Sequence, residues 1–212
     1  MTFDKASEDY FRWFYDTGVW KDMHYRGVRT LKVPSDMWSY QEILHERGIE
    51  WVVETGTRHG GSALYFADVL SGNGAAGRVI SIDIDRDSRM IESHPRIDFI
   101  IGDSSAESTV ETVRRMLPQG RGPLFLILDS EHTREHVLRE LHAFLPLLQS
   151  GDYLVVEDTC VNGHPVRPSF GPGPYEALHE FMAQHGEKFA RDEMRERKFG
   201  FTAAPGGYLI RR

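Results

Sequence analysis

The chain has 212 residues, of which 40% are hydrophobic and 27% are charged, so its composition is that of a globular protein and not of a disordered or collagen-like one. A formal net charge of −7 does not suit a protein that neutralises phosphates, which argues against nucleic acid and anionic membranes as partners and favours a small molecule. Cys160 is the single cysteine, which excludes an intrachain disulfide and a thiolate-rich zinc site.

The length fits one domain. We therefore expect a single domain over 1–212, with an N-terminal helical arm over 1–48 and a core over 49–212. Residues 1–25 lack the basic and apolar regions of a signal peptide, and no apolar run approaches the ~20 residues that a membrane span needs. The expected protein is cytoplasmic and has no membrane span.

Aromatic side chains at roughly helical spacing near the N-terminus predict a helical arm that packs against the rest of the chain. They are Phe3, Phe11, Phe14, Tyr15 and Trp20. A turn is expected at 24–27. A second amphipathic helix is expected over 37–47, and Gly48 follows it in the position of a helix C-cap.

Beyond residue 49, short apolar runs alternate with helical patterns. The runs predict strands over 51–53, 78–82, 97–101, 124–128 and 153–156, and the patterns predict helices over 62–70, 105–117, 135–148 and 175–185. The tail is expected to form an antiparallel hairpin. This order predicts an α/β fold with a doubly wound, mostly parallel, Rossmann-like sheet, in which ligands bind beyond the carboxyl ends of the strands.

A glycine-rich turn lies between the first strand of the core and the helix that follows it. Its glycines allow a close approach to a ligand, and the helix N-terminus offers N–H groups to a carboxylate or phosphate. The spacing G-x-x-x-G-G differs from that of dinucleotide enzymes, and Glu54 would repel a diphosphate but accept a hydrogen bond from an ammonium. A zwitterionic amino-acid moiety therefore suits the turn. The candidate cofactor-binding residues are Glu54, Thr55, Gly56, Thr57, Gly60, Gly61 and Ser62.

Two further strand ends extend this candidate cofactor site. Asp83 ends a strand 22 positions after Gly61, where α/β nucleotide enzymes bind ribose hydroxyls, although Asp85 competes for that role. Asp103 and Ser104 follow the next strand and could contact an adenine edge. Alternatively, Asp103 only caps the helix that follows.

Three carboxylates follow two strands that we expect to be neighbours. Asp129 follows the strand over 124–128, and Glu157 and Asp158 follow the strand over 153–156. Crowded carboxylates repel one another unless a cation lies between them, and oxygen ligands select Mg²⁺ or a similar hard ion. The alternatives are that these acids cap neighbouring segments or are simply solvated.

His132 lies three residues after Asp129, so both side chains can face one pocket. Its imidazole could accept a proton from a hydroxyl that a nearby metal ion has made more acidic, which makes His132 and Asp129 the candidate catalytic residues. The other histidines, His136 among them, are interpreted as surface residues. His59 in the glycine turn is the next candidate base, although a substrate or backbone contact suits its position better.

Together these motifs resemble the metal-dependent S-adenosylmethionine O-methyltransferases of natural-product and antibiotic biosynthesis, of the cephalosporin hydroxylase type, and the related macrolide-sugar O-methyltransferases. The resemblance implies the class I methyltransferase fold. It runs from residue 54 onward through ETGTxxGGS (54–62), SIDI (81–84), HPRI (94–97), LDSxH (128–132), VEDT (156–159) and FGPGP (170–174).

The resemblance implies a role for each motif. Glu54 and the glycine turn would hold the methionine part of S-adenosylmethionine, and Asp83 would bind its ribose. His132 would be the general base, and the loop through Asn162 and Phe170 would cover the substrate. The implied ligands of Mg²⁺ are Asp129, Glu157 and Asp158. The N-terminal arm matches the family least clearly, and a homo-oligomer is implied by the resemblance alone.

The resulting hypothesis is methyl transfer to a hydroxyl of a sugar or another diol-bearing secondary metabolite. Two acceptor oxygens would chelate Mg²⁺, and the deprotonated hydroxyl would attack the sulfonium methyl group. An N-methyltransferase remains an alternative, because amines need less help from a metal. An NAD-dependent oxidoreductase is disfavoured by the glycine spacing and by the carboxylate cluster, which hydride transfer does not need. A non-catalytic binding protein is disfavoured because all the candidate catalytic and metal-binding residues are present.

Overall fold

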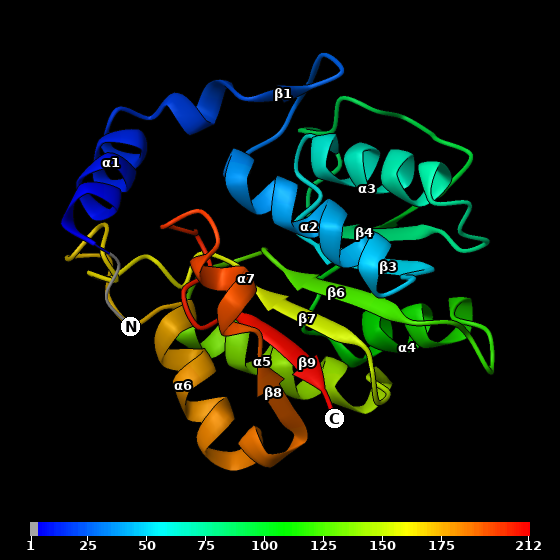
Figure 1. The fold of residues 1–212 in the computed structure, drawn as a ribbon. Helices are drawn as coiled ribbons and strands as arrows, with labels where there is room; N and C mark the ends of the chain where they lie inside the picture. The colour runs from blue at the N-terminus through cyan, green and yellow to red at the C-terminus, as the bar shows by residue number, and fades with distance from the viewer. Residues whose placement is uncertain (1–3) are drawn as a thin grey trace.

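The computed structural model describes residues 4–212, and a seven-stranded sheet lies at its centre (Figure 1). The strand order is β5-β4-β3-β6-β7-β9-β8. The strands are β3 (Trp51–Thr55), β4 (Val79–Asp83), β5 (Ile97–Ile101), β6 (Leu124–Leu128), β7 (Tyr153–Val156), β8 (Phe189–Arg191) and β9 (Tyr208–Arg211). The pairs from β5 to β7 are parallel, whereas β9 pairs antiparallel with both β7 and β8. The predicted doubly wound, mostly parallel sheet is confirmed.

Strand boundaries depart from the prediction where polar residues are buried. β5, β6 and β7 occupy the predicted ranges, but β3 continues through Glu54 and Thr55, which are both fully buried. Glu54 is in register with Ser81 of β4 and Ile127 of β6. The backbone of a central strand forms hydrogen bonds with both neighbouring strands whatever its side chains are. Here these hydrogen bonds extend the strand through Glu54, whose carboxylate is therefore buried in the core.

Helices cover both faces of the sheet (Figure 1). One face packs against α4 (Glu107–Met116), α5 (Arg134–Phe144) and α6 (Pro174–His185), and the other packs against α2 (Pro34–Glu46) and α3 (Gly61–Gly72). The helix predicted over 135–148 ends at Phe144, because Pro146 lies in the short 3-10 turn η2 (Leu145–Leu147) that follows. No helix among residues 4–212 has both the length and the apolar character needed to cross a bilayer.

The C-terminal strands pair as expected but are not joined by a short turn. β8 follows the 3-10 turn η3 (Gly186–Lys188) and is itself followed by the short helix α7 (Glu193–Arg197) before the chain returns as β9. Asp192 caps α7, since its side chain accepts a hydrogen bond from Arg195 N at 3.2 Å. β9 lies between β7 and β8, so the antiparallel pair is confirmed, whereas the simple hairpin is replaced by this longer connection.

The N-terminal arm consists of α1 (Lys5–Asp16), the 3-10 turn η1 (Val19–Asp22) and a small hairpin of β1 (His24–Tyr25) and β2 (Val28–Arg29). Arg26 and Gly27, in the turn, have positive φ angles of 49° and 81°, as a two-residue type I′ turn requires. The predicted turn at 24–27 is thus the hairpin. Phe3, one of the aromatic residues used to predict the arm, lies outside the described residues.

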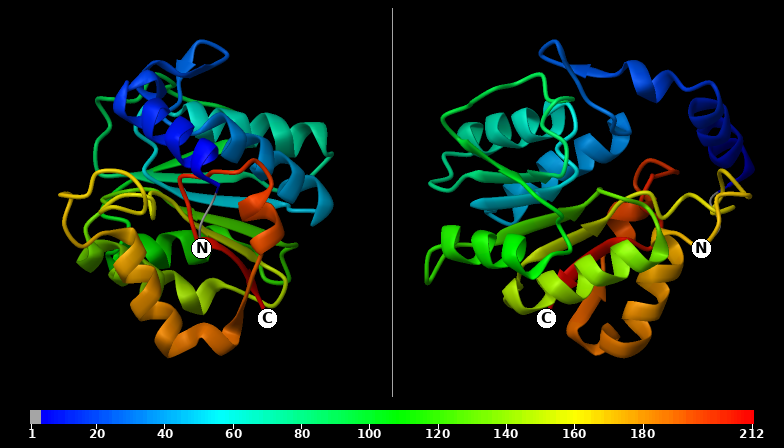
Figure 2. Two further views of the ribbon diagram at one scale, coloured as in Figure 1. Left: turned by 60° about the vertical axis from the view of Figure 1, so that its left-hand side comes forward. Right: turned by 180° about the vertical axis from the view of Figure 1, so that it is seen from behind.

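The arm runs past the carboxyl ends of the parallel strands (Figure 2). At one end, Phe11 and Phe14 of α1 pack in an apolar cluster with Cys160 and Val166 of the loop that follows β7. At the other end, the Tyr25 hydroxyl donates a hydrogen bond to Asp68 of α3 at 3.1 Å. The arm therefore contacts both sides of the region beyond the carboxyl ends of the strands, which is where this fold binds ligands.

Candidate functional site

A cavity of about 810 Å³ lies between the arm and the carboxyl ends of the strands. It is lined from the core by Gly56, Thr57, Gly61, Ser62, Asp83, Asp85, Asp103, Ser104, Asp129, His132, His136 and Asp158, and from the arm and the loop after β7 by Tyr15, Trp20, Lys21, Thr30, Lys32 and Arg167. The cavity joins the predicted cofactor residues to the predicted catalytic residues. Glu54, Thr55 and Glu157 are buried behind this wall and, like Gly60, are not among its lining residues.

Two glycines of the turn are required by neighbouring backbone. A Cβ on Gly56, whose φ is +85°, would lie 1.9 Å from the carbonyl oxygen of Asp129. A Cβ on Gly61 would lie 1.9 Å from Thr30 Oγ1 and 2.4 Å from the carbonyl oxygen of Arg29. The sequence interpretation assigned these glycines to a ligand. Both line the cavity, and both also admit neighbouring backbone, from the end of β6 at Gly56 and from the arm at Gly61. The arm therefore lies directly against the N-terminus of α3.

We expect Gly61→Ala to destabilise the protein by about 1–3 kcal/mol, because the new methyl group must displace the arm. Urea unfolding of the purified variant measures this loss. Gly72→Ala is the matched control: it lies in the same helix, and its Cβ would meet no atom within 4 Å. Equal stability of the two variants would contradict the described contact between the arm and α3.

Glu54 is a buried carboxylate with an incomplete set of hydrogen bonds. Its Oε2 accepts a hydrogen bond from Ser81 Oγ at 2.7 Å, whereas Oε1 is buried without a hydrogen-bond partner among residues 4–212. Burial, opposed by the charge of Lys32, raises the pKa of Glu54 to about 7. An unpartnered buried carboxylate oxygen costs free energy, and a donor that met it would recover that cost.

Asp83 and Asp103 are held by backbone groups at the ends of β4 and β5. Asp83 accepts hydrogen bonds from Arg58 N at 2.6 Å and from Asp85 N at 2.8 Å. Asp103 accepts from the N and Oγ of Ser105, and these bonds lower its pKa. Because α4 is capped at Ala106, Asp103 orders the preceding turn and does not cap the helix itself. Both carboxylates line the cavity.

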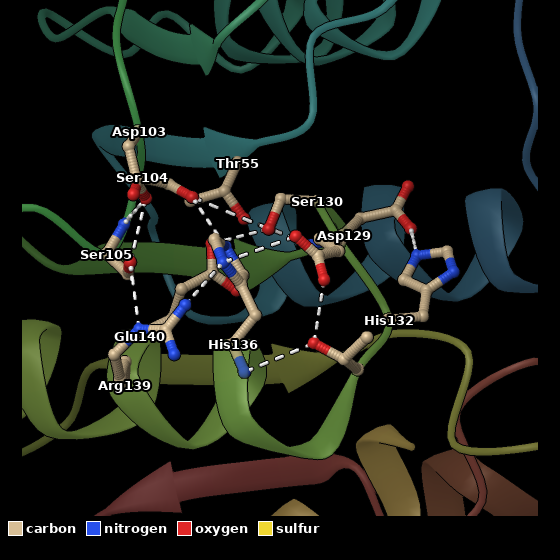
Figure 3. A network of polar contacts seen from close by, with 12 residues as sticks. Thr55, Asp103, Ser104, Ser105, Asp129, Ser130, His132, His136, Arg139 and Glu140 are labelled. Atoms are coloured by element: carbon tan, nitrogen blue, oxygen red, sulfur yellow. Dashed lines mark hydrogen bonds and ion pairs between the residues drawn. The ribbon is translucent and has the colours of Figure 1, made fainter. Parts of the chain in front are cut away.

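A polar network connects these strand ends to α5 (Figure 3). The fully buried Glu140 accepts a hydrogen bond from Ser130 Oγ at 2.7 Å, and His136 Nε2 lies 3.3 Å from Ser104 Oγ and 3.6 Å from Glu140 Oε1. The hydrogen bond with Glu140 is the main cause that raises the pKa of His136. The interpretation of His136 as a surface residue was wrong, since it is buried. Its spacing of four from Glu140 was the available signal.

Asp129, His132 and Asp158 form a cluster beyond the ends of β6 and β7. His132 Nε2 lies 3.3 Å from Asp129 Oδ1 and 3.3 Å from Asp158 Oδ2, and one potential ligand atom of each residue lies within 4.8 Å of the others. Burial opposes protonation of His132, but the charges of Asp158 and Asp129 outweigh it and raise its pKa to about 9. The imidazole therefore carries a proton at neutral pH in the metal-free protein.

Glu157, the third predicted metal ligand, points elsewhere. It accepts a hydrogen bond from the hydroxyl of Tyr40, and its Oε1 lies 3.3 Å from Lys32 Nζ. The same ammonium of Lys32 also forms an ion pair with Asp129 Oδ2. Sequence reasoning missed Lys32, because one lysine before a helix is ordinarily solvated. Its apolar neighbours Leu31 and Val33 were the only signal of burial.

The remaining wall of the cavity is aromatic and basic. The rings of Tyr15 and Trp20 stack with centroids 5.5 Å apart, and Trp20 Nε1 donates a hydrogen bond to the Tyr15 carbonyl. Arg167, from the loop after β7, lies over the Phe170 ring at 4.7 Å and reaches the cavity. Asn162 accepts a hydrogen bond from Gly171 N in the loop and donates one to Glu176 of α6, so it ties the loop to this helix and is not among the residues that line the cavity.

Comparisons with known proteins identify the family to which the chain belongs. A family model described as "Rhamnosyl O-methyltransferase/CmcI" matches residues 17–212. A rhamnosyl O-methyltransferase of Mycobacterium leprae (strain TN) is 45% identical over 210 residues, which cover 99% of this chain and 92% of the relative. A rhamnosyl O-methyltransferase of Mycobacterium tuberculosis is 43% identical, over 98% of this chain and 86% of the relative.

Solved structures share the fold. CmcI with Mg and SAM superposes with a TM-score of 0.74 at 25% identity, covering 91% of this chain and 77% of that chain. MycE in complex with Mg, SAH and mycinamycin VI superposes with a TM-score of 0.53 at 21% identity, over 72% of this chain and 42% of that chain, which supports the fold alone. The resemblance inferred from the motifs is confirmed. With matches over nearly its whole length, the chain belongs to the rhamnosyl O-methyltransferase/CmcI family of O-methyltransferases.

Proposed function

We propose that the protein transfers the methyl group of S-adenosylmethionine to a sugar hydroxyl, with a divalent cation such as Mg²⁺ bound beside the acceptor. The observation that carries this proposal is the single cavity in which the glycine turn and Asp83 share one space with Asp129, His132 and Asp158. A cofactor that reached from the turn would present its sulfonium methyl group to an acceptor held at the carboxylate cluster.

The cofactor end of the cavity suits the three parts of S-adenosylmethionine. The unpartnered Oε1 of Glu54 would gain a hydrogen bond from the methionine ammonium. Asp83, at the end of β4, would accept hydrogen bonds from the ribose hydroxyls. Ser104 and His136, which together line the cavity near the end of β5, offer polar groups to the adenine edge. CmcI, whose solved structure holds Mg and SAM, shares this fold.

The acceptor end suits a divalent cation. Asp129 and Asp158 would hold it, joined by Glu157 once the contact of Glu157 with Lys32 is released, and when bound it would make an acceptor hydroxyl more acidic. Carboxylates are the donors that Mg²⁺ prefers. His132 would then take the proton of the acceptor hydroxyl, provided that its own proton is no longer held between Asp129 and Asp158. The chain supplies the orientation of the imidazole through these same two carboxylates.

The aromatic wall supports a sugar as the acceptor. The Tyr15 and Trp20 rings offer apolar surface beside polar groups, which suits a ring that has both C–H and O–H groups. The curated relatives are named rhamnosyl O-methyltransferases, so a rhamnosyl glycoside is the first acceptor to test. The test incubates the protein with S-adenosylmethionine and this glycoside, with Mg²⁺ or with EDTA, and detects the methylated sugar by mass spectrometry.

Each outcome of this assay is informative. Transfer that requires the divalent cation supports the whole proposal. Transfer that is unchanged by EDTA overturns the metal but leaves the cofactor and acceptor. Failure of calorimetry to detect binding of either S-adenosylmethionine or its demethylated product overturns the proposal at its first step.

We expect Trp20→Ala to raise the KM for the acceptor about tenfold, equivalent to about 1.4 kcal/mol, because the acceptor loses a stacking surface. The dissociation constant of S-adenosylmethionine should stay within about twofold of the wild-type value. Steady-state kinetics and calorimetry measure these two quantities. Trp38→Ala, at an exposed position of α2 outside the cavity, is the control and should leave both unchanged.

A further inference from the structure

The arm places Lys32 inside the carboxylate cluster and fixes it from both sides. Thr30 lies against Gly61 at the start of α3. Asp36, four residues after Lys32, is buried and accepts hydrogen bonds from Ala203 N at 2.8 Å and from the Tyr208 hydroxyl at 3.0 Å. The segment between these two anchors is short, so the backbone of Lys32 cannot move far from the cluster. Only 4% of the lysine side chain is exposed.

The ammonium of Lys32 occupies the position that a bridging cation would take. It contacts Asp129 at the end of β6 and Glu157 at the end of β7, and these two strands are neighbours in the sheet. Two carboxylates that contact the same ammonium, one of them buried and the other largely so, need a positive charge between them. The Tyr40 hydroxyl donates a hydrogen bond to Glu157 Oε1, the same oxygen that faces the lysine, and so fixes this oxygen beside Lys32.

The same contacts explain why Glu157 stands apart from the other predicted ligands. The cluster that faces the cavity contains two carboxylates and an imidazole, a donor set less suited to Mg²⁺ than three carboxylates. While Lys32 is in place, a divalent ion cannot contact both Asp129 Oδ2 and Glu157 Oε1 without strong repulsion from the ammonium. If Lys32 moved away, Glu157 could complete an oxygen-only set and His132 would remain available as a base.

We propose that Lys32 is a built-in counter-ion that competes with the divalent cation for Asp129 and Glu157, so that metal binding displaces its ammonium. This inference rests on the metal site in the proposed function. The flexible four-carbon stem of a lysine allows the ammonium to move into the cavity that Lys32 already lines, while the anchored backbone stays in place. Lys32 is thus a positioning residue that keeps the carboxylates paired until the metal arrives.

The first test measures Mn²⁺ binding to the full-length protein by the electron paramagnetic resonance signal of free Mn²⁺. Lys32→Met should bind Mn²⁺ at least tenfold more tightly than the wild type, because the competing charge is gone. Without metal it should melt at a lower temperature, and metal should raise its Tm by more than that of the wild type. Lys21→Met is the matched control: it removes the same charge from a lysine that lines the same cavity and lies over the Trp20 ring. It should change the Mn²⁺ affinity less than threefold.

A second measurement uses the wild-type protein and does not depend on the folding of a variant. Acetylation of Lys32 by a lysine reagent, followed by mass spectrometry, should become at least threefold faster when Mn²⁺ is added, with Lys21 as the internal reference. Equal Mn²⁺ affinity in Lys32→Met and the wild type, or unchanged labelling of Lys32 in a protein that binds Mn²⁺, overturns the competition alone. Absence of Mn²⁺ binding to both proteins overturns the metal site as well, whereas calorimetry with S-adenosylmethionine still tests the methyltransferase proposal.

Discussion

A His132→Gln variant is expected to transfer methyl groups about 10²–10⁴-fold more slowly than the wild type while it binds S-adenosylmethionine with nearly the same affinity. Glutamine retains a polar group but cannot accept and hold a proton from the acceptor hydroxyl. Single-turnover methyl transfer and calorimetry separate the two effects. His142→Gln is the control, because His142 lies on the exposed side of α5, outside the cavity. A loss of less than about threefold in His132→Gln would exclude His132 as the base.

The same substitution should change how stability depends on pH in the metal-free protein. The pKa of His132 is raised from 6.5 to about 9 in the folded protein by Asp158 and Asp129, despite its burial. Its stabilising contribution is therefore fully present below pH 6.5 and is lost as the pH rises to about 9, with an upper limit of about 3 kcal/mol. Urea unfolding in EDTA at pH 6 and pH 9 should show this loss in the wild type and a smaller one in His132→Gln.

The second large effect concerns the ion pair between Arg121 and Asp152, whose side chains are 3% and 2% exposed. Asp152 also accepts hydrogen bonds from Leu124 N at 2.8 Å and from Gln149 N at 2.7 Å. It thus joins the beginnings of β6 and β7, the strands that carry the carboxylate cluster at their other ends. We expect Asp152→Ala to lower the free energy of unfolding by about 3–5 kcal/mol, because it leaves a buried guanidinium without its partner.

Asp98→Ala provides the comparison for Asp152→Ala. Asp98 forms the same kind of bidentate ion pair with Arg78, but both side chains are about one-third exposed. Exposed pairs contribute less than about 1 kcal/mol, so this variant should be nearly as stable as the wild type. Urea unfolding measures both variants. Similar losses for the two would show that burial does not set the value of the Arg121–Asp152 pair.

The fold was predictable because its central strands are buried on both faces. Continuous apolar runs gave β6 and β7 their full ranges, and parallel order placed the ends of these two strands together. The limit appears in β3, where Glu54 and Thr55 continue the strand. No apolar pattern can show that a carboxylate is buried, since its burial depends on partners, such as Ser81, that the fold brings from elsewhere in the sequence.

The site residues that directly follow strands could be predicted from the sequence. The site residues that the N-terminal arm contributes could not. Asp129 and Asp158 come together because their strands are adjacent, as expected. Lys32 lies 97 residues from Asp129 in the sequence, and no local spacing relates the two. The contact of Gly61 with the arm was missed for the same reason, because the segment that it admits is distant in the sequence.

The apolar cluster under α1 has a consequence for exchanging parts between related enzymes. Phe11 and Phe14 share this cluster with Cys160, Val166 and Ala203, so three distant stretches of sequence jointly shape the cavity wall that carries Tyr15, Trp20 and Arg167. A graft of the arm alone from a relative would place new side chains against an unmatched loop and leave gaps or overlaps in the cluster. Acceptor preference should therefore pass between relatives only when the arm, the loop after β7 and the segment before β9 are moved together.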